Sequence, residues 1–222
     1  MQTTLKNKWR VKDSVAGAEL YTQRKGGKHA SEMKLIEKAV TSLTDVETIL
    51  DAPCGAGRAM ILLERLGYKT AGVDLGDGSI TVAKREMIKR GMDPKIEKAN
   101  MVDLPFEENR FDAILCFRFF HHLAGPEIRE RIVAELCRVA DKYVLISYFS
   151  PLSITSIRRV VKKRLWNETS SQIATPLKEV EGYFSRCGFE LLKNYPQRQF
   201  FHTLHLAVFE KNKKGSVSHE NH

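Results

Sequence analysis

Short apolar segments rich in β-branched residues alternate along the chain with longer amphipathic segments. This alternation is typical of parallel strands joined by crossover helices. We therefore predict an α/β fold: a Rossmann-like doubly wound sheet of seven strands, mostly parallel, with an antiparallel C-terminal hairpin strand. The expected strands are residues 46–50, 69–75, 95–101, 111–116, 142–148, 189–195 and 202–210. The expected helices are residues 30–43, 57–66 and 79–90, one that begins at Pro126, and one between Thr175 and Gly188.

Length and composition bound the domain organisation. The 222 residues are 42% hydrophobic and 28% charged, which suits one globular domain with a small appendage. We expect an N-terminal lid or helical segment over residues 1–45, the main domain over 46–210 with a basic insertion at about 151–174, and a disordered tail over 211–222. No apolar segment has the length of a signal peptide or membrane span, so we expect a cytoplasmic protein.

The four cysteines are widely separated, with no C-x-x-C pair and no histidines at zinc spacing. This pattern favours reduced thiols and no metal site. The sequence leaves the oligomeric state open.

A net charge of +9 favours an anionic partner. Residues 151–166 carry apolar side chains at helical spacing, five basic residues at 158–164, and no acid. Two interpretations remain open: a cover that meets an acidic, phosphorylated or lipid-borne acceptor, with peripheral contact to the inner membrane surface, or an ordinary amphipathic helix with a solvated basic face.

The segment LDAPCGAGR at residues 50–58 places an acid directly before a glycine turn. The turn follows the first strand, at the sheet edge where open α/β folds bind ligands. A dinucleotide fingerprint would require a third glycine where Met60 stands, and Asp51 would repel a diphosphate. An acid at this position suits a cation such as S-adenosyl-L-methionine (SAM), which carries a sulfonium and an ammonium and no phosphate.

Two more acids follow successive strands. Asp74 ends the second strand, where a carboxylate can accept hydrogen bonds from both ribose hydroxyls. Asp103 follows the third strand and could accept from an adenine amino group, with Met101, Val102 or Leu104 beside the ring. Each acid alone also fits a turn or helix-cap residue.

Five segments together resemble the class I SAM-dependent methyltransferases, of the methyltransferase type 11-like branch that acts on small molecules, quinones and lipids. They are ILDAPCGAGR, GVDLG, NMVDLPFEENRFDAILC, FFHHL and KEVEGYFSRCGFELL. The resemblance runs from about Thr48 to Glu210 and implies SAM as cofactor and S-adenosyl-L-homocysteine (SAH) as product. One departure is RVADKYVLIS, which lacks the glycine turn that many relatives place before the fifth strand.

The resemblance also implies the site residues. It assigns Asp51, Gly55 and Gly57 to the methionine portion, Asp74 to the ribose, and Asp103 to the adenine. The expected cofactor contacts are Asp51, Ala52, Pro53, Gly55, Gly57, Arg58, Asp74, Leu75, Met101, Val102, Asp103, Leu104, Cys116 and Phe117. The residues expected to cover the substrate are Tyr21, Arg24, Arg118, Arg159 and Lys163.

Methyl transfer needs a general base only when the acceptor must lose a proton. The candidates are His121, His122 and Tyr148, which follow or end strands four and five. The alternative for the histidines is packing beneath the following loop.

Two other functions remain alternatives. An RNA methyltransferase would explain the charge, but the chain has no separate RNA-binding module, and CFRFF stands where an N-P-P-Y-like motif would be expected. We therefore do not expect nucleic acid as a partner. A non-catalytic SAM-binding partner protein has the same binding residues. We predict a methyltransferase acting on a small-molecule or lipid-linked, anionic acceptor.

Overall fold

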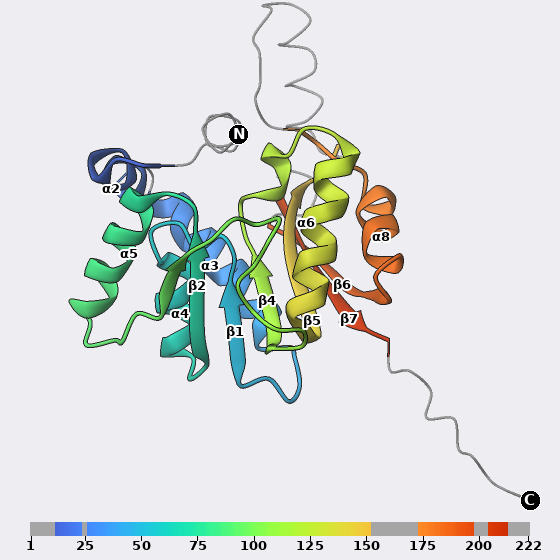
Figure 1. Cartoon of the computed structure of the whole chain (residues 1–222), viewed down its shortest axis with the longest axis horizontal. Coiled ribbons are helices and arrows are strands. Elements are labelled where there is room, and N and C mark those ends of the chain that lie inside the picture. The colour runs from blue at the N-terminus through green and yellow to red at the C-terminus, as the bar shows by residue number, and fades with distance from the viewer. Residues whose placement is uncertain (1–11, 24–25, 152–172, 198–203, 213–222) are drawn as a thin grey trace, which may run out of the picture.

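A seven-stranded sheet in the order β3-β2-β1-β4-β5-β7-β6 forms the centre of the computed structural model (Figure 1). The structure describes residues 12–23, 26–151, 173–197 and 204–212. The strands are β1 (Thr48–Asp51), β2 (Lys69–Asp74), β3 (Ile96–Lys98), β4 (Phe111–Cys116), β5 (Ala140–Phe149), β6 (Phe189–Pro196) and β7 (Leu204–Lys211). The helices are α2 (Val15–Gln23), α3 (Gly26–Val40), α4 (Arg58–Arg65), α5 (Asp77–Ile88), the short η1 (Phe120–His122), α6 (Pro126–Val139) and α8 (Leu177–Ser185).

The strand directions confirm the predicted sheet. β1 pairs in parallel with β2 and β4, and the parallel ladder continues to β3 on one side and β5 on the other. β7 is antiparallel to both β5 and β6, so β6 and β7 form the expected hairpin.

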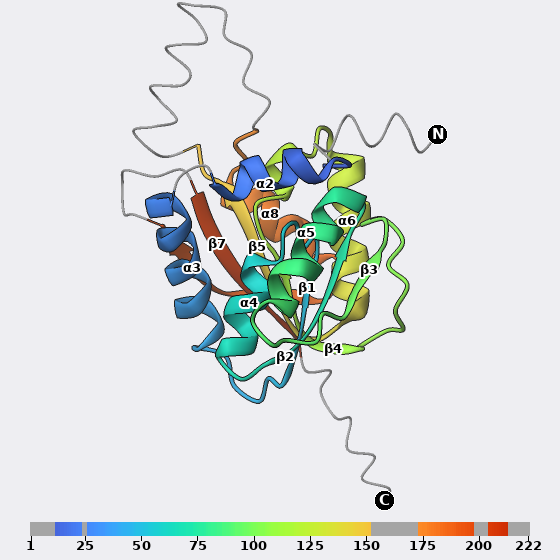
Figure 2. The same cartoon turned by 90° about the vertical axis from the view of Figure 1, so that its left-hand side faces the viewer.

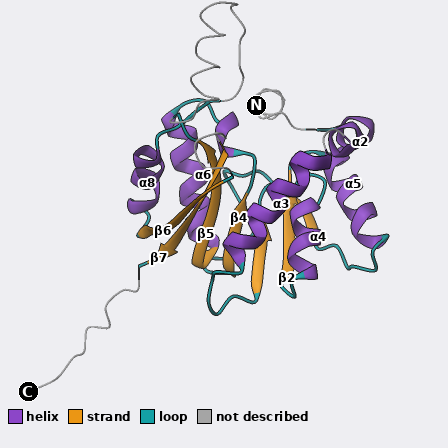
Figure 3. Cartoon of the chain, turned by 180° about the vertical axis from the view of Figure 1, so that it is seen from behind, coloured by secondary structure: helices purple, strands orange, loops and turns teal. Residues whose placement is uncertain are grey.

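Helices cover both faces of this sheet. Figures 1 and 3 show α6 and α8 on one face and α3 and α4 on the other. Neighbouring side chains along a strand point to opposite faces, so Ile49 packs in the core beneath α3 and α4 while Leu50 packs beneath α6 and α8. A third cluster, with Met60, Ala83 and Met87, joins α4 to α5. Because strands are buried on both faces, their sequences read as continuous apolar runs.

The segment RVADKYVLIS, which lacks the glycine turn of many relatives, passes from helix to strand without a loop. Helix α6 ends at Val139 and β5 begins at Ala140, and the register between β4 and β5 shifts at this point. The Asn109 backbone N–H donates to the Arg138 carbonyl at 2.9 Å, and Lys211 Nζ donates to the Ala140 carbonyl at 3.0 Å. The carbonyl groups of Arg138 and Ala140 at the end of the helix therefore have hydrogen-bond donors although no glycine turn follows.

Helix α2 lies within residues 1–45, where a lid or helical segment was expected, but the sequence did not predict its bounds. Ser14 begins it by accepting a hydrogen bond from the Gly17 N–H on its hydroxyl oxygen, at 3.2 Å. Figure 2 shows α2 lying beside α5 at the edge of the sheet where β1 and β2 end. No helix in the part of the chain that the structure describes combines the length and apolar character needed to cross a membrane.

Candidate functional site

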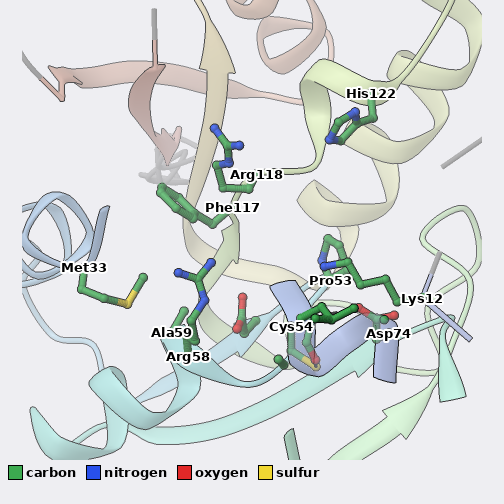
Figure 4. Close-up of a pocket in the computed structure, with 15 residues that line it drawn as sticks. Lys12, Met33, Pro53, Cys54, Arg58, Ala59, Asp74, Phe117, Arg118 and His122 are labelled. Carbon is green, nitrogen blue, oxygen red and sulfur yellow. Dashed lines mark hydrogen bonds between the residues drawn. The ribbon is translucent and has the colours of Figure 1, made fainter. Parts of the chain in front are cut away.

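A pocket of about 520 Å³ opens at the carboxyl ends of β1, β2 and β4 (Figure 4). Its volume is in the range of small-molecule sites. Eight residues predicted for the site line it: Asp51, Pro53, Gly55, Arg58, Asp74, Phe117, Arg118 and His122. Seven others complete the lining: Lys12, Gly17, Leu20, Met33, Cys54, Ala56 and Ala59.

The turn of residues 52–57 crosses between strands before α4 begins. The Cys54 N–H donates to the Val73 carbonyl at 2.8 Å, and the Gly57 N–H donates back to the Cys54 carbonyl at 3.0 Å. Gly57 has φ +76°, and a Cβ there would lie 3.0 Å from the Ala83 Cβ on α5. Glycine is therefore required for both the backbone angle and the close approach of α4 and α5.

Asp51 is a buried carboxylate at the end of β1. It is 2% exposed, and its Oδ2 atom makes no hydrogen bond within the described residues. Burial raises its pKa well above the usual value, and the nearby Asp74 charge adds to this, while Arg58 acts in the opposite direction. A cation in the pocket would stabilise the ionised carboxylate.

Asp74 is held by two backbone donors at the end of β2. Its Oδ2 accepts from the Gly55 N–H at 2.9 Å, and its Oδ1 accepts from the Gly76 N–H at 2.8 Å. Burial raises the pKa of Asp74, partly offset by these two hydrogen bonds. A carboxylate has about four acceptor positions, so both oxygens retain capacity for hydroxyl donors from a ligand.

The predicted adenine loop lies outside the pocket lining. Met101 and Leu104 are buried in the core, and Asp103 is exposed. The Leu104 N–H donates to Glu135 Oε1 at 3.0 Å, which fixes the loop to α6. The other predicted cofactor contacts that do not line the pocket are Ala52, Gly57, Leu75, Val102 and Cys116. The adenine contact of Asp103 stays a prediction.

Of the three base candidates, His122 lines the pocket. His121 is fully buried, and its ring stacks on Phe149 with centroids 4.1 Å apart, as the packing alternative expects. Tyr148 is buried outside the lining, where its hydroxyl accepts from Asn194 Nδ2 at 3.1 Å. Burial raises the pKa of Tyr148 to about 12. Both features argue against the predicted base role of Tyr148.

The methyltransferase domain family matches residues 50–145, which contain the end of β1, the glycine turn, β2, β3 and β4. Residues 50–145 are a methyltransferase domain.

Two further comparisons agree with this domain. A ubiquinone biosynthesis O-methyltransferase of Pseudoalteromonas translucida is 31% identical over 107 residues, which cover 48% of this chain and 45% of that protein. A second protein of that name, from Nitrosospira multiformis, is 29% identical over 40% of this chain and 38% of its own length. The chain thus spans less than half the length of these curated relatives.

The solved structures show that the methyltransferase domain has the class I methyltransferase fold. The magnesium protoporphyrin IX methyltransferase of Synechocystis, with bound SAH, superposes with a TM-score of 0.76 at 15% identity, covering 96% of this chain and all of that one. A SAM-dependent methyltransferase from Methanosarcina mazei gives a TM-score of 0.65 at 19% identity over 78% of this chain and 96% of that one.

N-terminal residues complete the pocket of the methyltransferase domain. The Ser79 N–H donates to the Lys12 carbonyl at 3.2 Å. A Cβ on Gly76 would lie 2.6 Å from the Lys12 carbonyl oxygen, and one on Gly78 would lie 2.4 Å from the Ser14 carbonyl carbon. These two glycines therefore let residues 12–15 pack directly on the start of α5.

Several residues predicted to cover the substrate have no described position. Arg24, Arg159 and Lys163 lie outside the described residues, as do most of the predicted insertion and tail, and the side chain of Tyr21 is not described. Within the described ranges, no group of three or more histidine, cysteine, aspartate or glutamate side chains has an arrangement that could hold a metal ion.

Sequence reasoning missed Glu32, Lys12 and Met33, which contribute to the pocket or its charged wall. Glu32 had a usable signal, since it shares the apolar face of α3 with Ile36 and Ala39. An acid on the apolar face of a helix is uncommon unless it is paired.

Proposed function

We propose that the chain is a SAM-dependent methyltransferase that acts on a small-molecule or lipid-linked, anionic acceptor and releases SAH. The observation that carries this proposal is the buried Asp51 carboxylate, whose Oδ2 atom has no hydrogen-bond partner in the described part of the chain. A buried carboxylate oxygen without a partner is stabilised by a cationic ligand and repels a phosphate.

The pocket residues fit SAM in three respects. Asp51 would stabilise the positive charge of the sulfonium and ammonium, and Asp74 would accept hydrogen bonds from the ribose hydroxyls. Gly55 has φ +54°, and a Cβ there would meet no atom within 4 Å, so the turn leaves open space beside the pocket. A nicotinamide dinucleotide would place its diphosphate against the same acids.

Alignment of donor and acceptor supplies much of the catalysis in this reaction class. Bound SAM supplies a methyl group on a sulfonium, and its in-line transfer to the acceptor's lone pair leaves the electrons of the broken bond on sulfur. His122 is placed to take a proton from an acceptor that must lose one. The two acids and the turn would hold the donor, while Phe117, Arg118 and His122 line another part of the pocket (Figure 4).

The proposed reaction is tested by incubating the protein with methyl-labelled SAM and a panel of acceptors that carry carboxylate or phosphate groups. We expect SAH formation that depends on an acceptor, with label transferred to it. Tight SAH binding without turnover of any acceptor would instead support a non-catalytic binding protein.

Two observations support an anionic acceptor. Arg58 and Arg118 line the pocket, and the segment at 158–164 carries five basic residues. Relatives named ubiquinone biosynthesis O-methyltransferase act in the biosynthesis of a quinone, which agrees with a lipid-linked acceptor.

Charge reversal in the basic segment should weaken contact with an anionic membrane surface. We expect Arg159→Glu with Lys163→Glu to lower binding to vesicles containing anionic lipid by about 30-fold, at about 1 kcal/mol for each basic residue lost and more for reversal. Cosedimentation with vesicles measures the effect. Matched reversals at the exposed Lys95 and Lys178 should change binding less. Equal losses in the two pairs would show only a net-charge effect and contradict a membrane role for this segment.

The contact between α5 and residues 12–15 should be needed for cofactor affinity. A Cβ in Gly78→Ala would meet the Ser14 backbone at 2.4 Å, so residues 12–15 must move away from the pocket. We expect SAH affinity to fall about 10-fold, equivalent to about 1.4 kcal/mol. Isothermal titration calorimetry measures this.

Gly182→Ala is the matched control, because the nearest atom to a Cβ there is Arg186 Nη1 at 3.7 Å. It should leave SAH affinity unchanged and stabilise α8 by about 0.5–1 kcal/mol. Unchanged affinity in Gly78→Ala would contradict a role for the N-terminal segment in the pocket.

A further inference from the structure

Two arginines from different elements line one side of the pocket. Arg58 is the first residue of α4, and Arg118 follows the end of β4 by two residues. Their side chains are 24% and 16% exposed. Figure 4 shows both on the side of Met33 and Phe117, and Asp74 with Lys12 on the other side.

Glu32 of α3 joins the two arginines. It is 2% exposed, and its Oε2 lies 3.6 Å from Arg58 Nη1 while its Oε1 lies 3.6 Å from Arg118 Nε. These are ion-pair separations that are longer than good hydrogen bonds. One buried negative charge thus faces two positive charges, which leaves the group of three with a net charge of +1.

Hydrogen-bonding capacity is also left over. Among the described residues, Glu32 Oε2 and Arg118 Nε and Nη1 are buried and have no hydrogen-bond partner. A buried polar group without a partner destabilises the fold, and most such groups are paired by protein, water or ligand. The unused donors of Arg118 therefore indicate an anionic ligand group.

Arg118 is held firmly in this place. Its backbone has φ +62°, which is uncommon for a residue other than glycine, and its N–H donates to Ser147 Oγ at 2.6 Å. Its guanidinium carbon lies 5.3 Å from the centroid of the Phe149 ring. Residues in such uncommon backbone conformations cluster at active sites and ligand contacts, which agrees with a binding role for Arg118.

We expect a carboxylate as the ligand group, because a phosphate, which a guanidinium also binds with two hydrogen bonds, would carry more negative charge against Asp51 in the same pocket. A planar guanidinium presents two parallel N–H donors that fit the two oxygens of a carboxylate. β1 and β4 are adjacent, about 5 Å apart, so a ligand can place a cation on Asp51 and an anion on the arginines at once.

We propose that Arg58 and Arg118, oriented by Glu32, form a carboxylate-binding site in this pocket. The carboxylate belongs either to the amino-acid end of the cofactor or to the acceptor, and naming these two sources rests on the proposed function. The chemistry of the site is the same for both sources.

The test compares ligands with and without a carboxylate. SAH carries the amino-acid carboxylate, whereas 5′-methylthioadenosine has the same nucleoside and thioether without it. Benzoate and benzamide provide a matched acceptor-like pair, titrated into the ligand-free and the SAH-loaded protein by NMR. The variants are Arg118→Gln, Arg118→Lys and Arg58→Gln, and the control is Arg186→Gln, whose surface ion pair with Glu130 is 2.8 Å long.

If the carboxylate is that of the cofactor, Arg118→Gln should weaken SAH binding by about 10- to 100-fold and leave 5′-methylthioadenosine binding unchanged. If it is that of the acceptor, SAH binding should be unchanged, and the preference of the SAH-loaded protein for benzoate over benzamide should be lost. Arg118→Lys should recover only part of either effect, because an ammonium lacks the planar pair of donors. Arg58→Gln should act in the same direction as Arg118→Gln.

The proposal is overturned if Arg118→Gln and Arg58→Gln bind every probe as the wild type does. It is also overturned if the variants weaken the binding of SAH and of 5′-methylthioadenosine equally, since this would indicate general damage to the pocket. A wild-type protein that binds neither nucleoside would contradict the proposed function. The benzoate titration of the ligand-free protein would then decide on the carboxylate site by itself.

Discussion

Asp74→Ala is expected to weaken binding of SAM and SAH by about 100-fold or more. The variant would lose two hydrogen bonds from the ribose hydroxyls to a charged carboxylate, and each contributes about 1.5–3 kcal/mol. The variant should also unfold at lower temperature, because the Gly55 and Gly76 N–H groups lose their acceptor. Calorimetric titration gives the affinity, and thermal denaturation without ligand gives the stability.

Asp77→Ala provides the control for Asp74→Ala. Asp77 is an exposed acid three residues further along, at the start of α5, and it pairs with Lys98 at 2.7 Å. SAM affinity in this variant should stay close to that of the wild type. If Asp74→Ala folded and bound SAM as tightly as the wild type, the assignment of Asp74 to the ribose would be wrong.

Asp51→Asn is expected to stabilise the ligand-free protein while weakening its binding of SAM. The pKa of Asp51 is raised in the folded state, so the folded protein disfavours the ionised form. This destabilisation is absent below the unfolded-state pKa of about 3.9 and grows as the pH rises to the folded-state pKa. Near neutral pH the variant should therefore melt higher, by about 2–4 °C for each 1 kcal/mol relieved.

The same residue should make SAM binding depend on pH. A bound cation favours the Asp51 carboxylate, so binding lowers its pKa and releases a proton. As the pH rises from about 4 to the raised folded-state pKa of Asp51, SAM affinity should rise in the wild type and lose this dependence in Asp51→Asn. Calorimetry in buffers of different ionisation enthalpy measures the released proton. Binding in the wild type without pH dependence or proton release would contradict a cation site at Asp51.

The sheet could be predicted because its apolar segments are short, regular and separated by helical patterns. Each predicted strand matches an observed one, although boundaries moved by several residues. Helix α2 could not be seen in this way, because VAGAELYTQ has no marked apolar stripe and its position depends on close packing against Gly76 and Gly78.

Part of the pocket followed from the sequence for a similar reason. Asp51 and Asp74 end adjacent parallel strands, and such ends meet at one edge of a sheet. Glu32 lies far from them in the chain and belongs to no motif, so only tertiary packing brings it to the arginines. The position of Tyr148 outside the pocket lining could not be predicted, because all residues at the end of β5 are buried and a fully buried strand does not reveal which face meets the pocket.

The most direct test of the pocket assignment is thermal unfolding of the wild-type protein with SAM, SAH and NADH in parallel. A ligand at about 100 times its Kd should add about 2.7 kcal/mol to the free energy of unfolding. We expect SAM and SAH to raise the melting temperature and NADH to leave it unchanged. Stabilisation by NADH alone would show that the acid before the glycine turn does not select a cation, and the proposed function would be wrong.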